Sequence, residues 1–152
     1  KNKEPLIIVE KNFYTKNELD GIWQELNFLT YEHKLYPPNR TNSAVDTNGR
    51  TMKKNSGVFL TELYTDHNAS NILNIISRTR SKDYVEYLSQ YDPIFKYMRT
   101  ATNYSALLSY YQDGDYYESH FDKSAMTILS YFFEEPKQFS GGNIVFSDWV
   151  MY

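Results

Sequence analysis

A chain of 152 residues with 41% hydrophobic and 23% charged residues is long enough to bury one core, and it predicts a single domain over residues 1–152. The net charge of −3 comes without a basic stripe, and no apolar run reaches the length of a membrane span, so neither a nucleic acid nor a membrane is expected as a partner. Cysteine is absent, which excludes disulfides and thiolate metal ligands and fits a reducing compartment, here the cytoplasm.

The N-terminal part of the chain predicts a strand followed by a capped helix. Residues 6–9 are a short apolar run of the kind found in strands. Thr15 and Glu18 have the spacing of a capping box, in which each side chain accepts a hydrogen bond from the backbone amide of the other residue. Apolar residues at helical spacing follow, and we expect the helix to run to about Leu29 with Trp23 in its buried stripe.

A long polar loop and a group of short helices are expected next. Residues 30–56 contain a Pro-Pro pair and an Asn-Gly pair, which predict a loop with a hairpin tip. A loop of this length in a small domain often contacts substrate, and Lys53 and Lys54 are its candidate contacts. Residues 58–64 then predict a strand. Helices are expected over residues 68–78, from Ser81 and from Pro93.

Beyond Thr100 the sequence changes from helical to β-rich patterns. Runs rich in aromatic and β-branched residues are separated by turn-forming segments. Helices followed by strands are typical of an α+β domain. The runs predict four strands, over residues 104–111, 116–122, 126–133 and 143–146.

The stretch that contains His120 and Asp122 is the candidate active site. On a strand, residues two apart point to the same face, so this imidazole and this carboxylate would lie side by side. Such a pair makes up two of the three protein ligands of a 2-His-1-carboxylate Fe(II) site, which leaves metal positions open for substrate and O2. His33 and His67 lie in polar stretches without a carboxylate at ligand spacing, so neither is expected to bind the metal.

Three motifs around this stretch have the spacing of a known enzyme family. The first runs Tyr-x2-Gly-x2-Tyr-x2-His-x-Asp, the second Thr-x-Leu-x-Tyr and the third Gly-Gly-x3-Phe. They are matched here by Tyr111, Gly114, Tyr117, His120 and Asp122, by Thr127, Leu129 and Tyr131, and by Gly141, Gly142 and Phe146. Over about a quarter of its length the chain therefore resembles the prolyl 4-hydroxylase-like Fe(II)/2-oxoglutarate dioxygenases, and it looks closest to uncharacterised microbial and phage members.

This resemblance implies a fold. Family members are built on a double-stranded β-helix, or jelly roll, with the metal in the mouth of the barrel and supporting helices outside. By that analogy residues 1–100 supply helical support and the loop, and residues 101–152 form the first half of the jelly-roll core. The family's second histidine, and the Arg or Lys that pairs with 2-oxoglutarate, do not occur before Tyr152. We therefore expect a barrel that is incomplete at the C-terminus, in a piece of a longer polypeptide or in a degenerate member.

The resemblance also implies roles for individual residues. His120 and Asp122 would bind Fe(II) and form the catalytic centre. The cosubstrate 2-oxoglutarate would be held by Tyr111, Thr127, Leu129 and Tyr131. Of these, the hydroxyl-bearing residues would donate hydrogen bonds and the leucine would form an apolar wall. The implied reaction hydroxylates a C–H bond of a peptide, a protein or a small molecule, for example at a prolyl residue, and releases succinate and CO2. Ascorbate is a further candidate cofactor.

Two alternatives are left open at this point. A non-catalytic jelly-roll or cupin-like binding module would use the tyrosines as a ligand groove and His120 as a hydrogen-bonded core residue. An acid–base hydrolase would use carboxylates that lie in and beside a turn, where solvated turn formers are common, namely Asp113, Asp115, Glu118 and Asp122. The substrate and the oligomeric state also stay open.

Overall fold

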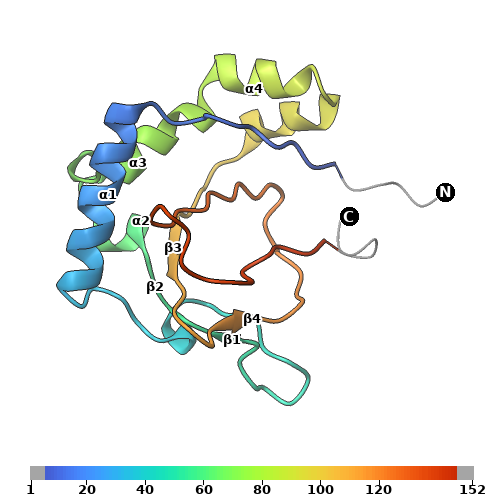
Figure 1. Ribbon diagram of the computed structural model, residues 1–152. Coiled ribbons are helices and arrows are strands. Elements are labelled where there is room, and N and C mark those ends of the chain that lie inside the picture. Colours follow the sequence, from blue (N-terminus) through green and yellow to red (C-terminus); the bar gives the residue numbers. More distant parts are fainter. Residues whose placement is uncertain (1–5, 147–152) are drawn as a thin grey trace.

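The computed structural model describes residues 6–146 as an α+β arrangement of short helices and four short strands (Figure 1). The ends of the expected 1–152 domain lie outside these residues. The helices are α1 (Lys16–Tyr31), α2 (Leu60–Leu63), α3 (Asn71–Ile76) and α4 (Lys82–Ser89), and the 3-10 helices are η1 (Pro38–Arg40), η2 (His67–Ala69), η3 (Ser77–Arg80) and η4 (Pro93–Thr100). The strands are β1 (Lys53–Lys54), β2 (Ser56–Phe59), β3 (Leu107–Tyr110) and β4 (Tyr116–Tyr117).

The longest helix, α1, begins at the expected capping box and forms one wall of the core. The Glu18 amide donates to the Thr15 hydroxyl over 3.3 Å, and the Thr15 amide donates to Glu18 Oε2 over 2.8 Å. The helix continues slightly beyond Leu29 to Tyr31. Its buried side chains follow the spacing i, i+3, i+7 of one helix face, namely Ile22, Glu25 and Leu29, whereas Trp23, expected in the buried stripe, is only partly buried.

The core lies where α1, α3 and the β2–β3 pair meet. Leu29, Val58, Leu60 and Leu73 are buried there in mutual contact. Burying one aliphatic side chain stabilises a fold by roughly 1.5–3 kcal/mol, so this cluster is the main source of stability in the described residues. Partly buried apolar side chains surround it, among them Leu35, Tyr64, Ile72, Ile76, Ala106 and Leu108.

A buried carboxylate ties α1 to the start of α3. Glu25 accepts a hydrogen bond from the Ser70 hydroxyl over 2.7 Å and another from the Ile72 amide over 2.7 Å. Ser70 also caps α3, because its hydroxyl accepts from the Leu73 amide. A buried carboxylate is costly unless it is hydrogen-bonded, and the free amides at a helix N-terminus are suitable donors. The polar contact therefore fixes how the two helices pack.

The strands form two separate two-stranded antiparallel sheets, so the expected jelly roll is wrong. β2 pairs with β3, with Ser56 opposite Tyr110, and β1 pairs with β4, with Lys53 opposite Tyr117. A jelly roll needs two sheets that together enclose a barrel. Each sheet here has only two strands, and both strands of the β1–β4 sheet are only two residues long, so these sheets do not enclose a barrel.

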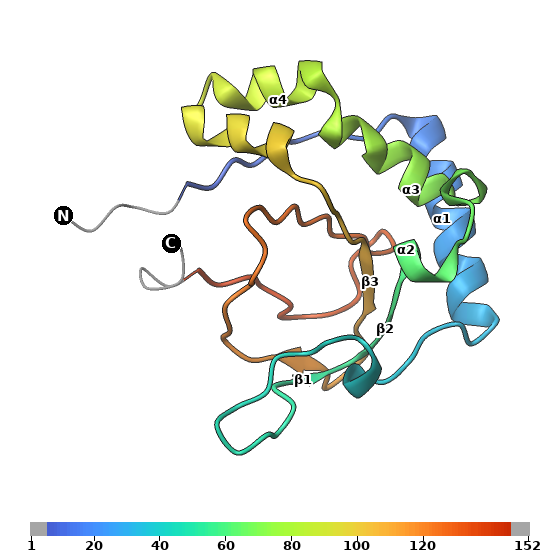
Figure 2. The same ribbon diagram turned by 180° about the vertical axis from the view of Figure 1, so that it is seen from behind.

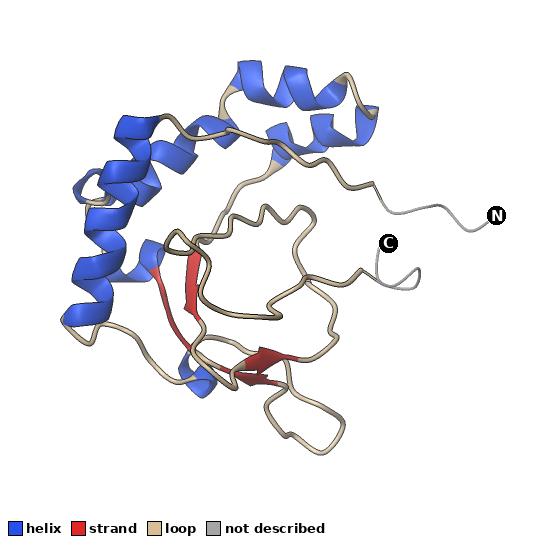
Figure 3. Ribbon diagram, viewed as in Figure 1, coloured by secondary structure: helices blue, strands red, loops and turns tan. Residues whose placement is uncertain are grey.

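Two of the four strands expected after Thr100 are absent from the described residues. Residues 126–133 and 143–146 have no regular secondary structure and are drawn as coil in Figure 3. Their composition favours strands, but a strand is stable only when a partner satisfies its backbone N–H and C=O groups. Within residues 6–146 neither segment has a partner strand. The other two expected strands are present in shortened form as β3 and β4.

Before Thr100, one expected strand is absent, another is shorter than expected, and two expected helices are confirmed. Residues 6–9 are not a strand. The strand expected over residues 58–64 ends at Phe59, where the chain turns into α2. The helices expected at Ser81 and Pro93 are confirmed as α4 and η4, and the Asn-Gly hairpin tip is confirmed by an antiparallel bridge between Val45 and Thr51.

The helices form an arc along one side of the molecule, and the coil of residues 118–146 runs across its open side (Figures 1 and 2). α1 packs against α3, and α4 packs against η4. In the part of the chain that the structure describes, no helix has the length and apolar character needed to cross a membrane.

Candidate functional site

His120 and Asp122 lie together just after β4. The Nε2 atom of His120 is 3.3 Å from Oδ1 of Asp122. β4 ends at Tyr117, so the pair is carried by coil and not by the strand that the sequence predicts. The structure nevertheless brings the imidazole and the carboxylate into contact, as the His-x-Asp spacing predicts.

A backbone hydrogen bond orients the His120 ring. Its Nδ1 atom is 2.8 Å from the carbonyl oxygen of Glu118, and because a carbonyl only accepts, Nδ1 carries the proton. In the neutral ring Nε2 is then the unprotonated nitrogen, which can bind a metal ion, and it lies 3.3 Å from Asp122 Oδ1.

The geometry of this pair fits one metal ion. Two ligand bonds of about 2.1 Å that meet at a right angle place their donor atoms about 3 Å apart. The 3.3 Å between Nε2 and Oδ1 is close to that separation. The second carboxylate oxygen, Oδ2, accepts from the Thr127 hydroxyl over 3.0 Å, which fixes the orientation of Asp122. Within residues 6–146, however, no third histidine or carboxylate joins the pair to complete a three-ligand site.

Tyr117 is the central contact of the site, although the sequence indicated it only as a motif position. Its ring stacks on His120 with 3.6 Å between ring centroids and 13° between ring planes. The Lys53 ammonium lies 4.9 Å from the centre of the same ring, and the Ala44 amide donates to the tyrosine hydroxyl. Burial raises the pKa of Tyr117, and the charge of Asp122 raises it further. The three-residue spacing before His120 was the available signal for this role.

The tyrosines expected to hold 2-oxoglutarate are exposed, Tyr111 by 45% and Tyr131 by 63%. Partial burial raises the pKa of each phenol, and the neighbouring Tyr117 raises the pKa of Tyr111 further. Both phenols are protonated at neutral pH and can donate a hydrogen bond to an anion. Leu129 is exposed and forms no enclosed apolar wall in the described structure.

The segment that carries Thr127 and Tyr131 is not a strand, but its successive side chains contact different neighbours. Ser130 and Phe132 face α1, where Ser130 bonds the Tyr14 hydroxyl over 2.7 Å and Phe132 packs on Tyr14 and Trp23. Thr127 lies on the side of Asp122. The strand expected over residues 126–133, which would have carried Thr127, Leu129 and Tyr131, is therefore absent, although odd- and even-numbered residues still differ in their contacts.

Two other carboxylates of the stretch, Glu118 and Asp115, are held in ion pairs. Arg50 binds both Glu118 oxygens, over 2.7 and 2.9 Å, and also contacts Asp46. Arg50 holds the pKa of Glu118 below its ordinary value, which is the wrong direction for a general acid. Asp115 pairs with Lys54 over 3.3 Å. These contacts tie the hairpin loop to β4, and they favour a structural role over the hydrolase alternative.

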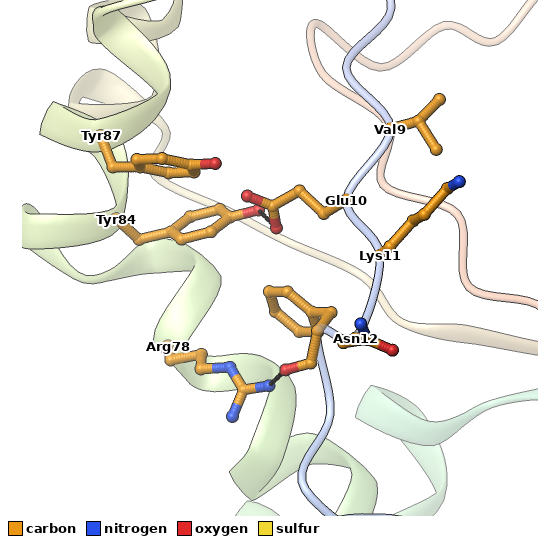
Figure 4. Close-up of a pocket in the computed structure, with 8 residues that line it drawn as sticks. Val9, Glu10, Lys11, Asn12, Arg78, Tyr84 and Tyr87 are labelled. Carbon is orange, nitrogen blue, oxygen red and sulfur yellow. Dashed lines mark hydrogen bonds between the residues drawn. The ribbon is translucent and has the colours of Figure 1, made fainter.

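The remaining histidines and two surface hollows lie elsewhere. His67 is bonded to the Tyr104 hydroxyl over 2.8 Å, and His33 is exposed after α1. One hollow of about 420 Å³ lies between residues 9–13 and the start of α4, where Glu10 accepts a hydrogen bond from Tyr84 (Figure 4). Another, of about 440 Å³, is lined by Trp23, Asn27 and residues 133–135.

The candidate site can therefore offer one imidazole and one carboxylate to a metal, with tyrosine hydroxyls nearby. Comparison of this chain with protein-family models, with curated proteins and with solved structures finds no match. The assignment of the candidate site therefore depends on the geometry of His120 and Asp122 and on the spacing of the three sequence motifs.

Proposed function

We propose that this chain carries the site of an Fe(II)- and 2-oxoglutarate-dependent dioxygenase, with His120 and Asp122 as two of the metal ligands. The observation that carries the proposal is the close approach of His120 and Asp122. The Nδ1 proton of His120 is bonded to the Glu118 carbonyl, which leaves Nε2 as the nitrogen available to a metal, and Nε2 lies 3.3 Å from Asp122 Oδ1, a separation suited to one metal ion.

The bound metal would supply the oxidation. Hydroxylation of a C–H bond consumes one O2 and one 2-oxoglutarate and yields the alcohol, succinate and CO2, with one oxygen atom in the alcohol and the other in succinate. The 2-oxo acid and O2 would take metal positions that the protein leaves open. Because the iron has to stay ferrous, we place the activity in a reducing cytoplasm, with ascorbate as a candidate reductant and a peptide, protein or small molecule as substrate.

The chain's own residues would orient the ligands and the cosubstrate. The Glu118 carbonyl holds the Nδ1 proton of His120, and the Thr127 hydroxyl holds Oδ2 of Asp122. Tyr111 and Tyr131, whose phenols are protonated at neutral pH, would donate to the carboxylates of 2-oxoglutarate. Remaining metal positions would be filled by the cosubstrate, by water or by groups outside residues 6–146.

An anaerobic titration with Fe(II) and then 2-oxoglutarate tests the proposal. A 2-oxo acid chelated to Fe(II) produces a visible charge-transfer absorption band, and we expect the parent chain to produce it. The variants His120→Ala and Asp122→Ala each remove a ligand, so both should lose the band. Metal binding should also raise the melting temperature of the parent, because a ligand that binds only the native state stabilises it.

His33→Asn is the matched control for this experiment. His33 is exposed and has a positive φ of 52°, a conformation that asparagine tolerates well. The control should keep the absorption band and the thermal shift of the parent. Absence of the band in the parent, or its survival in His120→Ala, would contradict the proposed function.

A further inference from the structure

The hollow between residues 9–13 and the start of α4 has no part in the candidate metal site. Its volume of about 420 Å³ lies within the range of small-molecule binding sites, roughly 300–1,000 Å³. Side chains from both walls line it, among them Glu10, Phe13, Tyr84 and Tyr87. Tyr87 is exposed and the other three are partly buried, so a ligand in the hollow can reach all of them.

A carboxylate lies at the centre of this hollow. Figure 4 shows the Glu10 side chain directed at the hydroxyl ends of Tyr84 and Tyr87. The Tyr84 hydroxyl donates to Glu10 Oε2 over 2.9 Å. The pKa of Tyr87 is raised by its hydrogen bond with Tyr91 and then by Glu10, so the charge of the carboxylate acts on both hydroxyls. Within residues 6–146 Glu10 forms no ion pair.

The two cationic side chains that line the hollow do not neutralise Glu10. Arg78 is bonded to the Glu18 carboxylate and to the Phe13 carbonyl, and Glu18 balances its charge. Lys11 points away from α4 in Figure 4. The charge of Glu10 is therefore uncompensated within the described part of the chain, and the hollow can attract a cation.

Aromatic rings surround the carboxylate and favour an organic cation over a metal ion. The Tyr84 ring centre lies 5.9 Å from that of Phe13 and 6.0 Å from that of Tyr87. Ring faces attract cations, and Phe13 already holds the Arg78 guanidinium 4.1 Å from its centre. A metal ion needs several charged or imidazole ligands, and no group of three occurs in the described residues.

We propose that this hollow binds an organic primary ammonium group, with Glu10 as its counter-ion and the hydroxyl oxygens of Tyr84 and Tyr87 as further acceptors. An ammonium group has three N–H donors, which these three acceptors match. A tyrosine oxygen can accept a hydrogen bond while its own proton is donated elsewhere. The carbon chain of the amine would lie against the tyrosine rings. This site goes beyond the proposed function and does not depend on a metal.

Titration of the metal-free protein with n-butylammonium tests the proposal. The ring signals of Tyr84 and Tyr87 are followed by NMR, with tetramethylammonium and butyrate as comparison ligands. We expect saturable shifts with n-butylammonium, roughly tenfold weaker binding of tetramethylammonium because it has no N–H donor, and no binding of butyrate. Added salt should weaken the binding, because it screens the charge pair. No saturable response to n-butylammonium, or equal affinity for tetramethylammonium, would overturn the proposal.

Glu10→Gln is the decisive variant, because it removes the charge and keeps an acceptor oxygen for Tyr84. We expect it to bind n-butylammonium roughly tenfold more weakly or less. Glu32→Gln makes the same change at an exposed position after α1 and should keep the affinity of the parent. Unchanged affinity in a folded Glu10→Gln protein would contradict the assignment of Glu10 as counter-ion.

Melting temperature provides a second readout that does not depend on the NMR signals. A ligand that binds only the native state raises this temperature, so n-butylammonium should stabilise the parent and Glu32→Gln more than Glu10→Gln. Equal stabilisation of all three proteins would mean that the amine binds elsewhere, which overturns the proposal. The Fe(II) titration does not involve this hollow, so the ammonium site and the dioxygenase assignment can each fail without the other.

Discussion

The helical region and the coil of residues 118–146, which face each other in Figure 2, differ in how far they bury similar side chains. Leu29 on α1 is 0% exposed and contacts the core, whereas Leu129 in the coil is 54% exposed. Capped helices and the β2–β3 pair surround the first leucine, while the coil has no regular secondary structure. Stability therefore resides in one region and the candidate chemistry in the other.

The coil is attached to the rest of the molecule at a few points. Arg50 binds Glu118 at its start, and Tyr14 and Trp23 contact Ser130 and Phe132 further along. A segment held by few contacts opens locally at lower free energy than a packed core does. Residues that bind metal or substrate are commonly carried on such segments, and rigid neighbouring elements position them.

The largest expected difference between the two regions is in the response to the same truncation. Leu29→Ala should lower the free energy of unfolding by about 2–5 kcal/mol, because it leaves a cavity in the core. Leu129→Ala should change it by less than about 0.5 kcal/mol, because the side chain is already exposed. Urea denaturation followed by circular dichroism measures both values. Equal losses for the two variants would show that Leu129 in the coil contributes to the core as much as Leu29 does.

A smaller effect is expected at the buried carboxylate that joins α1 to α3. Glu25→Ala leaves the Ser70 hydroxyl and the Ile72 amide without their acceptor, and we expect a loss of about 1–3 kcal/mol in the same denaturation experiment. Glu25→Gln keeps one acceptor oxygen and should lose less. If the glutamine variant were as unstable as the alanine variant, the negative charge and not the hydrogen bonds would be the important feature of Glu25.

The smallest effect is expected at the capping box of α1, where it should depend on pH. The Thr15 amide, followed by Arg78, holds the pKa of Glu18 below its ordinary value of 4.5. A carboxyl with a lowered pKa in the native state stabilises the fold above its unfolded-state pKa and loses that contribution as pH falls through the native-state pKa. Glu18→Gln should therefore cost about 1 kcal/mol or less at pH 7, and its difference from the parent should shrink below pH 4.

The urea midpoints of parent and Glu18→Gln at pH 7 and pH 3 measure this effect. Glu134→Gln, in the exposed coil, is the control and should match the parent at both pH values. A difference for Glu18→Gln that stayed the same from pH 7 to pH 3 would mean that the carboxylate charge makes no contribution to the cap.

Local sequence signals were sufficient for much of the helical region and for part of the site. The Thr15–Glu18 box, the Ser81 cap and the Asn-Gly tip each depend on residues within one or two turns of chain, and all three are confirmed. The contact between His120 and Asp122 is likewise local, because the two residues are only two positions apart in the sequence. These features could be predicted because their partners are close in sequence.

Tertiary structure decided what depends on distant partners. Whether residues 126–133 form a strand depends on a neighbouring strand, and composition alone wrongly predicted one. The central place of Tyr117 and the burial of Lys53 follow from the pairing of β1 with β4, which are separated by more than sixty residues. By itself the sequence determined where α1, α4 and η4 begin and that His120 and Asp122 lie together. Only the tertiary structure decided which side chains surround that pair, because burial and strand pairing are properties of contacts that local spacing does not specify.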